Sequence, residues 1–175
     1  FFNCISIGSE VNRVNIRNKP GEKLCIALQG MGTTFIKLGQ FLATRPDIIG
    51  EELSKKLENL QDKLPPFSLM QAKEIIKNDL GDITYNSIIN LTEPVAAASI
   101  AQVHKAKIKE DNIIKNVAIK VLRPNIKKIF NDEIDAIMLL AYIVEGLIAK
   151  TKRLKLIEVV FLFKEITNHE MDLRF

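Results

Sequence analysis

A lysine in the second half of the chain has the surroundings of a phosphate-binding group. Lys120 ends the segment VAIK, residues 117–120, within the β-branched run NVAIKVLR, which predicts a strand. The small-residue segment EPVAAASIAQVHKA, residues 93–106, ends fourteen residues before this lysine. A lysine held on a strand beside such a loop supplies a fixed positive charge for the α- and β-phosphates of a nucleotide.

The small-residue segment follows the spacing of the glycine-rich loop of protein kinases, G-x-G-x-x-G-x-V. The glycine positions fall on Ala96, Ala98 and Ala101, and the valine falls on Val103. Each alanine adds a Cβ where glycine lets backbone N–H groups close on phosphates, so we expect a stiffer loop that meets the phosphates differently. Ser99 adds a hydroxyl that could bind a phosphate or cap the loop.

Each of the two motifs has a simpler explanation when it is taken alone. The alanines and Ser99 could be a strip of small residues that serves packing, and VAIK is a common composition for an ordinary strand. Their order and separation match a kinase N-lobe, in which a strand, a loop, a second strand and a hairpin precede the strand that carries the lysine. Together they favour a nucleotide site.

Hydrophobic periodicity predicts the elements that position these motifs. Residues 1–19 show no clear period and are expected to be irregular or strand-like. A helix is expected from Pro20 onward, with Leu24, Leu28 and Met31 on one side. Ser68 is expected to cap a helix that stops at Gly81. The other helices predicted before residue 91 cover 33–44, 51–63 and, as a short one, 84–90, with a break at the segment RPDIIG.

The period changes after residue 98. Residues 99–109 alternate as a strand, residues 110–116 are expected to form a turn, and residues 116–123 form the strand of Lys120. His104 is expected to be a partly exposed strand histidine. Pro124 is expected to open a helix that runs to about Ala149, and a last helix begins near Leu156. The cluster RPNIKK, residues 123–128, is expected to be a solvated helix start, with contact to anionic lipid as the alternative.

Composition limits the classes of function. Hydrophobic residues make up 47% of the chain, the net charge is +4 and the pI is about 9.0, so a packed core is possible and nucleic acid is not indicated. This charge would tolerate an anionic nucleotide or an anionic membrane surface. Cys4 and Cys25 form no metal-ligand pattern, so no metal site is expected and both are interpreted as isolated buried thiols. The longest apolar run, residues 137–149, is shorter than the ~20 residues of a membrane span.

Four elements in order give the sequence a specific resemblance to the UbiB family of protein-kinase-like proteins of ubiquinone biosynthesis. The first is the segment FIKLGQFLATRPD with the pattern K-x-G-Q, Lys37, Gly39 and Gln40. The others are the alanine-rich segment, the strand lysine, and the pattern E-x-D in HEMDLRF, Glu170 and Asp172. The match runs from about Gly21 to the end of the chain.

The resemblance implies an α+β fold, an atypical kinase-like N-lobe of a small antiparallel sheet and helices behind a helical K-x-G-Q extension. On this basis residues 1–19 form an irregular segment, 20–90 the extension, and 91–175 a partial N-lobe. It implies ATP or ADP with Mg²⁺ as cofactor, with Ala96, Ala97, Ala98, Ser99, Ala101, Val103, Lys120 and Gln40 at the nucleotide. Lys120, Lys37, Glu170 and Asp172 would carry catalysis. We expect a Lys37–Glu170 contact to tie the extension over this site.

The catalytic loop and the D-F-G metal motif of kinases do not occur in these residues, so we expect the chain to be a fragment that is inactive alone. The glutamate that pairs with the strand lysine is left open among Glu133, Glu145 and Glu165, whereas the family pattern places it directly after Phe175. Implied partners are a nucleotide, a lipid or polyprenylphenol quinone precursor, other ubiquinone-synthesis proteins and a membrane surface. The implied location is the cytoplasmic face of the bacterial inner membrane or its organellar equivalent.

Three readings of function follow. The first is an ATP-dependent atypical kinase or ATPase that supports the polyprenylphenol hydroxylation stage of ubiquinone synthesis. The second is a pseudokinase scaffold that binds nucleotide or lipid and organises ubiquinone-synthesis enzymes without turnover. The third is a helical interaction domain with an incidental strand pair, and this reading alone requires that nucleotide gives no stabilisation.

Overall fold

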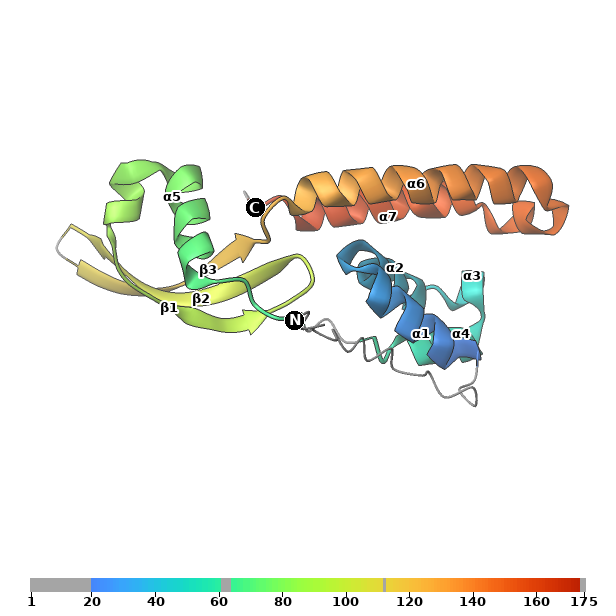
Figure 1. The fold of residues 1–175 in the computed structure, drawn as a ribbon, viewed down its shortest axis with the longest axis horizontal. Coiled ribbons are helices and arrows are strands. Elements are labelled where there is room, and N and C mark those ends of the chain that lie inside the picture. Colours follow the sequence, from blue (N-terminus) through green and yellow to red (C-terminus); the bar gives the residue numbers. More distant parts are fainter. Residues whose placement is uncertain (1–19, 61–63, 112, 174–175) are drawn as a thin grey trace, which may run out of the picture.

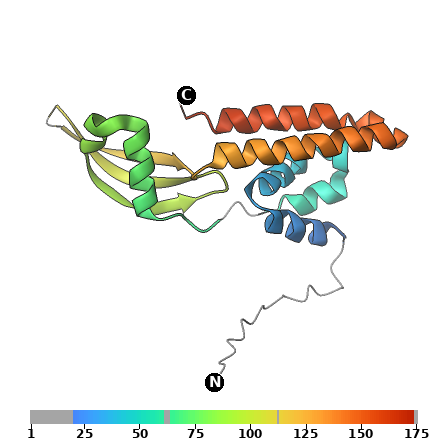
Figure 2. The same ribbon diagram turned by 45° about the horizontal axis from the view of Figure 1, so that its top comes forward.

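The computed structural model describes residues 20–60, 64–111 and 113–173 (Figure 1). Within these residues the chain forms a group of small helices, a three-stranded antiparallel sheet with one helix across it, and a long helical hairpin. The hairpin lies over the small helices, and the sheet extends from one end of it (Figures 1 and 2). The α+β class predicted from the sequence is therefore confirmed. The expectation for residues 1–19 falls outside the described residues.

The small helices are α1 (Pro20–Met31), α2 (Thr33–Ala43), α3 (Pro46–Ile49) and α4 (Glu51–Leu57). Gly32, at φ 111°, separates α1 from α2 in a backbone conformation that favours glycine. The four helices share a core of apolar residues, Leu28, Ala43, Leu57 and Leu60. Cys25 is half-buried here; its thiol donates to the Lys56 carbonyl at 3.4 Å, and burial raises the pKa of this thiol.

The sequence predicted α1 and α2, with three differences in this region. Leu24 and Met31 are exposed, so of the three expected core residues of α1 only Leu28 is buried. The segment after Arg45 forms the one-turn helix α3 instead of a break, because Pro46 at its first position presets a helical φ. The helix predicted to run to residue 63 ends at Leu57.

Helix α5 (Leu69–Asn86) begins as predicted, since Ser68 and Gln71 form a capping box. Its first helical stretch stops at Gly81, as predicted, where φ is 75° and the backbone is not helical. A second, short helical stretch follows and ends at Asn86, so the short helix expected over residues 84–90 is present but ends earlier, because strand β1 begins at Ile88.

The sheet has the order β1-β2-β3, with β1 (Ile88–Ala97), β2 (Ala101–Glu110) and β3 (Ile113–Leu122). The sequence predicted only β2 and β3 as strands and placed their turn too far along the chain, at 110–116. It missed β1 because this strand carries Pro94 and two register shifts beside it, which hide the alternation. An edge strand tolerates both features.

Helix α6 (Ile126–Leu147), the 3₁₀ segment η1 (Ala149–Leu154) and helix α7 (Leu156–Glu170) form the hairpin. Pro124 lies outside α6, one residue before the N-cap position, where Asn125 has a left-handed conformation and makes no side-chain cap, so the expected role of this proline in the first turn is wrong. None of the helices among the described residues is both long and apolar enough to cross a membrane.

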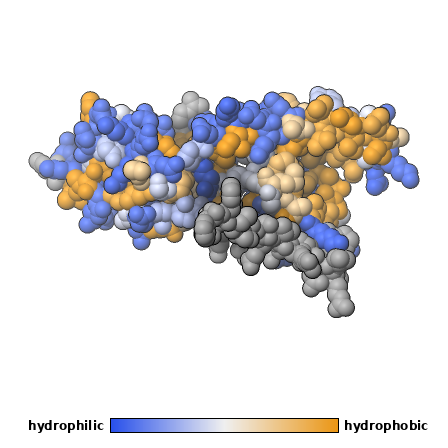
Figure 3. All heavy atoms as spheres, viewed as in Figure 1, coloured by the Kyte–Doolittle hydropathy of each residue, from blue (hydrophilic) through white to orange (hydrophobic). Residues whose placement is uncertain are grey.

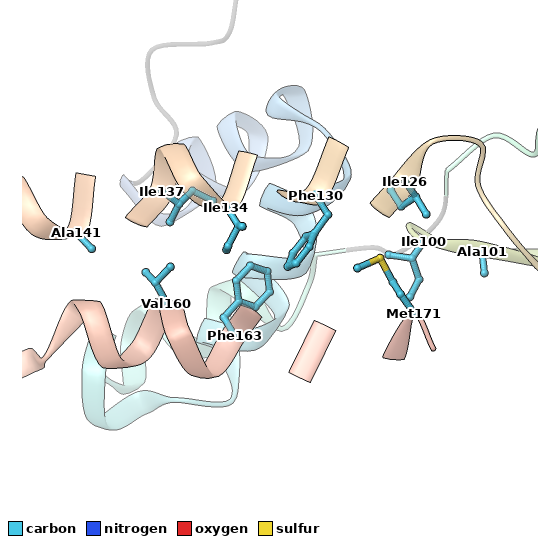
Figure 4. Packing of buried hydrophobic residues seen from close by; sticks show 10 residues of the cluster. All are labelled: Ile100, Ala101, Ile126, Phe130, Ile134, Ile137, Ala141, Val160, Phe163 and Met171. Carbon is cyan, nitrogen blue, oxygen red and sulfur yellow. The ribbon is translucent and has the colours of Figure 1, made fainter. Parts of the chain in front are cut away.

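The main core lies inside the hairpin, where α6 and α7 face each other (Figure 4). Phe130 and Phe163 meet there edge to face, with ring centroids 5.8 Å apart. Phe41 of α2 packs on Phe163 at 5.5 Å, which fixes the small helices against the hairpin. Ile100, from the turn between β1 and β2, packs into the same core and joins the sheet to it.

Candidate nucleotide-binding site

Three residues of the two kinase-like motifs form a row across the sheet. Ala96 of β1 lies opposite Val103 of β2, and Val103 lies opposite Lys120 of β3. Directly opposed residues of antiparallel strands point to the same face, so all three share one face of the sheet. Lys120 and Ala96 are exposed on it, whereas α5 lies across the other face (Figure 1).

The turn between β1 and β2, residues 98–101, lies within the segment that the sequence aligned with a glycine-rich loop. The Ala98 N–H donates to the Ala101 carbonyl at 2.8 Å and closes it. The described non-glycine residues with positive φ are Asp111, Asn125 and Lys155, so none belongs to this turn. Alanine therefore fits here without backbone strain, and it restricts the backbone of the turn more than glycine would.

Burial divides the alanine-rich segment into an outer and an inner part. Ala96 is exposed, and Ala97 and Ala98 are half-buried, so the backbone before the turn is accessible to a ligand. Ser99 is fully buried and Ala101 is buried as well. The sequence left two roles open for the Ser99 hydroxyl, binding a phosphate or capping the loop. Because Ser99 is fully buried, its hydroxyl is not placed to contact a phosphate on the open face.

Arg123 holds the alanine turn in place. Its backbone N–H donates to the Ile100 carbonyl at 2.9 Å, and its Nε donates to the Ala98 carbonyl at 3.0 Å. Its Nη1 donates to the Pro65 carbonyl, also at 3.0 Å. The expectation that this arginine belongs to a solvated helix start is therefore wrong. The guanidinium instead links the turn to the segment before α5.

A second buried network fixes β2 from the face that α5 covers. The Gln102 amide pairs with the backbone of Phe67, accepting at 3.1 Å and donating at 3.2 Å. Its nitrogen also lies 2.9 Å from His104 Nε2, and His104 Nδ1 lies 2.8 Å from the Thr92 carbonyl. An amide nitrogen only donates, so a neutral imidazole with its proton on Nδ1 satisfies both contacts. His104 is fully buried, contrary to the expected partial exposure.

Two adjoining clefts open beside Lys120. One has a volume of about 510 Å³ and the other of about 840 Å³, and Lys120 lines both together with Asp172, Leu173, Leu80 and Ile119. Ala118, exposed next to Lys120 along β3, lines the smaller cleft. Both clefts also contain residues of α5, and neither contains Ala96 or Val103, so they open along β3 on the α5 side and meet the row at Lys120. A lysine at this junction suits phosphates, and the small side chains of the open face leave room for a flat base.

The E-x-D element consists of Glu170, the last residue of α7, and Asp172, two residues beyond it. Glu170 and Asp172 both line the 510 Å³ cleft with Lys120. Glu170 also forms an ion pair with Lys37 of α2, in which Lys37 Nζ and Glu170 Oε1 are 2.8 Å apart. This is the contact expected from the sequence. It joins the K-x-G-Q helix to the cleft of the strand lysine.

Lys37 and Gln40 line a separate groove of about 400 Å³ between α2 and α7. Gln40 Nε2 lies 3.5 Å from the Leu60 carbonyl, so the Gln40 amide faces the small helices. The structure thus brings Lys37 to the site through Glu170 and leaves Gln40 in the groove, apart from the alanine turn. The motif requires a small residue at Gly39, between Lys37 and Gln40, because a Cβ there would collide with Leu60 and Leu28.

The described residues contain no group of three or more His, Cys, Asp or Glu side chains that could hold a metal ion. The candidate partners of Lys120 left open by the sequence, Glu133, Glu145 and Glu165, do not line either cleft beside it.

Sequence reasoning missed Arg123, Gln102 and Phe67 as residues that position the site. The one available signal was the place of Arg123, three residues after Lys120 and directly before a proline. Gln102 stood out only as a polar residue on the buried side of an alternating strand.

Comparison with known proteins supports the kinase-like reading. Residues 59–175 match the ABC1 atypical kinase-like domain. The proteins named "Probable protein kinase UbiB" from Marinobacter nauticus and Vibrio cholerae are 36% and 38% identical over 155 and 156 residues. The protein of the same name from Tolumonas auensis is 39% identical over 154 residues. These matches cover 87–88% of the chain but only 28% of each relative. No solved structure matches.

Proposed function

Since the chain belongs to the ABC1 atypical kinase-like family, we propose that the complete protein binds ATP or ADP with Mg²⁺ and acts as an atypical kinase or ATPase. The chain spans 28% of the length of its relatives, so this activity is assigned to the whole protein. The catalytic-loop base and most metal ligands would come from residues outside it, as would the glutamate that pairs with Lys120.

The observation that carries the proposal is the row Ala96, Val103 and Lys120 on the open face of the sheet. In this assignment the adenine ring lies against Val103 and the small side chains beside it. Lys120 neutralises the α- and β-phosphates. The backbone of Ala96, Ala97 and Ala98 meets the phosphates as a fixed edge, because the turn is anchored by Arg123 and Ile100.

The Lys37–Glu170 ion pair gives the K-x-G-Q helix a role in this site. Glu170 faces the cleft of Lys120 while it holds Lys37, so α2 is tied to the rim of the nucleotide site. We assign Lys37 and Glu170 to this closure and Asp172 to the nucleotide side, where its carboxylate lines the cleft beside Lys120. Gln40 would reach the nucleotide only after a rearrangement of α2.

The four sequence elements that resemble the UbiB family, whose name the relatives carry, support a role in ubiquinone biosynthesis at the polyprenylphenol hydroxylation stage. The substrate class would be a lipid or a polyprenylphenol quinone precursor, handled at the cytoplasmic face of the bacterial inner membrane or its organellar equivalent. Other proteins of ubiquinone synthesis would be its partners.

The experiment that tests the site is thermal unfolding of the full-length protein with and without Mg-ADP. Ligand at ~100 times its dissociation constant should stabilise the folded protein by about 2.7 kcal/mol. Lys120→Met should abolish this stabilisation. Lys109→Met is the matched control, since Lys109 alternates onto the same face of β2 at its far end. Equal stabilisation of Lys120→Met and wild type would refute the site assignment.

The scaffold reading rests on one observation, the replacement of all three loop glycines by alanine. Turnover separates it from the enzyme reading. ATP hydrolysis that rises with membranes or phenolic quinone precursors, and is lost in Lys120→Met, supports the enzyme. Nucleotide binding without such hydrolysis supports the scaffold, and the absence of any nucleotide stabilisation leaves an interaction domain without a nucleotide site.

A further inference from the structure

The end of the α6–α7 hairpin farthest from the sheet carries an exposed apolar stripe. Leu139, Leu140, Ile143 and Leu147 recur at spacings of three and four, so they share one side of α6. Leu139 and Leu140 are 60% and 59% exposed, and Leu147 is 81% exposed. Figure 3 shows hydrophobic residues gathered over this end of the hairpin. Single exposed leucines are ordinary, whereas a contiguous stripe marks an interaction surface.

The stripe runs directly into a basic turn. Ile148, 49% exposed, continues it into η1, which contains Lys150, Lys152 and Arg153, all exposed. Residues 146–157 include four cations, the fourth being Lys155, and no acidic residue, whereas Glu145 directly before them lies four residues after the buried Ala141 and so away from the stripe. Lys155 is paired with Glu158 at 2.9 Å, which leaves the other three as the charged face of the turn. Hydrophilic residues appear at the extremity of the hairpin in Figure 3.

An apolar stripe that ends in a cluster of cations is complementary to an anionic lipid surface. The leucine side chains can enter the boundary between headgroups and acyl chains, while the cations stay at the level of the phosphates. A second copy of the chain fits less well, because a symmetric contact through the tip would bring two sets of like charges together. A packed protein domain would have to bury three cations and supply a partner for each.

We propose that the tip of the α6–η1–α7 hairpin, residues 139–153, docks on an anionic membrane surface. Leu140, Ile143, Leu147 and Ile148 insert, and Lys150, Lys152 and Arg153 bind lipid phosphates. The inference deepens the membrane location in the proposed function and depends on that part of it alone. The nucleotide site at Lys120 lies on the sheet, at the opposite end of the hairpin from this tip (Figure 1).

A local probe tests this surface in the full-length protein whatever else holds the protein at a membrane. Leu147→Cys is labelled with the fluorophore NBD in a background whose native cysteines are replaced by serine. Vesicles contain doxyl-labelled phosphatidylcholine, with or without 30% phosphatidylglycerol. The label at position 147 should be quenched by the vesicles that contain phosphatidylglycerol. The matched control is Ile83→Cys, an apolar residue of α5 that is 92% exposed, whose label should not be quenched.

The charged part is tested on the same labelled protein. Each cation near an anionic surface contributes about a fivefold gain in affinity, so Lys150→Ala, Lys152→Ala and Arg153→Ala together should weaken tip binding about a hundredfold. The label should then stay unquenched at the lipid concentration that half-quenches the unaltered tip. Lys23→Ala, Lys55→Ala and Lys73→Ala remove three exposed lysines elsewhere and should leave quenching unchanged.

Three results would overturn the inference. A label at position 147 that is blue-shifted and unquenched before and after vesicles are added shows that protein covers the tip, either the rest of the polypeptide or a second copy. Equal quenching with and without phosphatidylglycerol would show that the tip does not require an anionic lipid surface. Equal quenching of the labels at positions 147 and 83 would show that the protein does not dock specifically through the tip. Stabilisation of the same protein by Mg-ADP is measured in parallel. If the tip label is quenched but Mg-ADP gives no stabilisation, the proposed function fails and the docking inference stands.

Discussion

Replacement of Arg123 by methionine isolates the contribution of one side chain to the alanine turn. Methionine keeps most of the aliphatic length but removes the donors to the Ala98 and Pro65 carbonyls, both at 3.0 Å. A hydrogen bond from a charged donor contributes ~1.5–3 kcal/mol when it is buried. The bond to Ala98 is partly buried, whereas the bond to Pro65 is exposed and water can replace it. We therefore expect a local destabilisation of about 2 kcal/mol.

Native-state hydrogen exchange measures this effect at the turn itself. The Ala98 N–H donates to the Ala101 carbonyl at 2.8 Å, so its exchange reports opening of the turn. A loss of about 2 kcal/mol corresponds to exchange about thirtyfold faster in Arg123→Met, since 1.4 kcal/mol is a factor of ten. Lys128→Met, an exposed residue at the start of α6, should leave it unchanged. If Ala98 exchanges at the wild-type rate in Arg123→Met, the guanidinium does not hold the turn and this reasoning fails.

Two further changes test how the K-x-G-Q helix is held. Reversing the charge of Lys37 or Glu170 should weaken Mg-ADP stabilisation, and the double reversal should restore it, with a coupling energy of about 1 kcal/mol for this partly exposed pair. A double variant no better than either single one shows that the ion pair has no role. Gly39→Ala should destabilise the protein by about 1–3 kcal/mol in urea unfolding, because its Cβ meets Leu60 and Leu28 in the core. Gly30→Ala, with open space around it, should stabilise by up to about 1 kcal/mol, and equal effects at both positions would contradict this packing.

The sequence predicted those features that local pattern or charge determines. The helices of residues 20–43, the Ser68 cap and the strand of Lys120 all depend on short-range periodicity or capping chemistry. The pair of Lys37 and Glu170 was expected because opposite charges occur in two elements that the family resemblance places together. Their 133-residue separation would have hidden the pair without that resemblance.

The residues that shape the site bind backbone groups of distant segments, and no sequence pattern encodes such targets. Gln102 pairs with Phe67 across 35 residues, and Arg123 reaches Pro65 across 58 residues. Each contact depends on the register of β2 and on the path of the chain before α5. For the same reason His104 was misjudged. Alternation places it on one face of β2 but does not say which face α5 will cover.

The end of α7 connects the candidate nucleotide site to the small helices. Glu170 lines the cleft of Lys120 as well as the groove between α2 and α7, and Met171, the next residue, is buried in the core that contains Ile100 of the alanine turn. A shift of α2 that carries Lys37 would therefore pull on a helix end whose neighbouring residue packs with the turn. Because close-packed interiors transmit displacement, we expect a shift of α2 to change the position of Asp172 beside Lys120 without contact between α2 and the nucleotide. The K-x-G-Q helix would then regulate the cleft through α7, and Gln40 would not need to reach it.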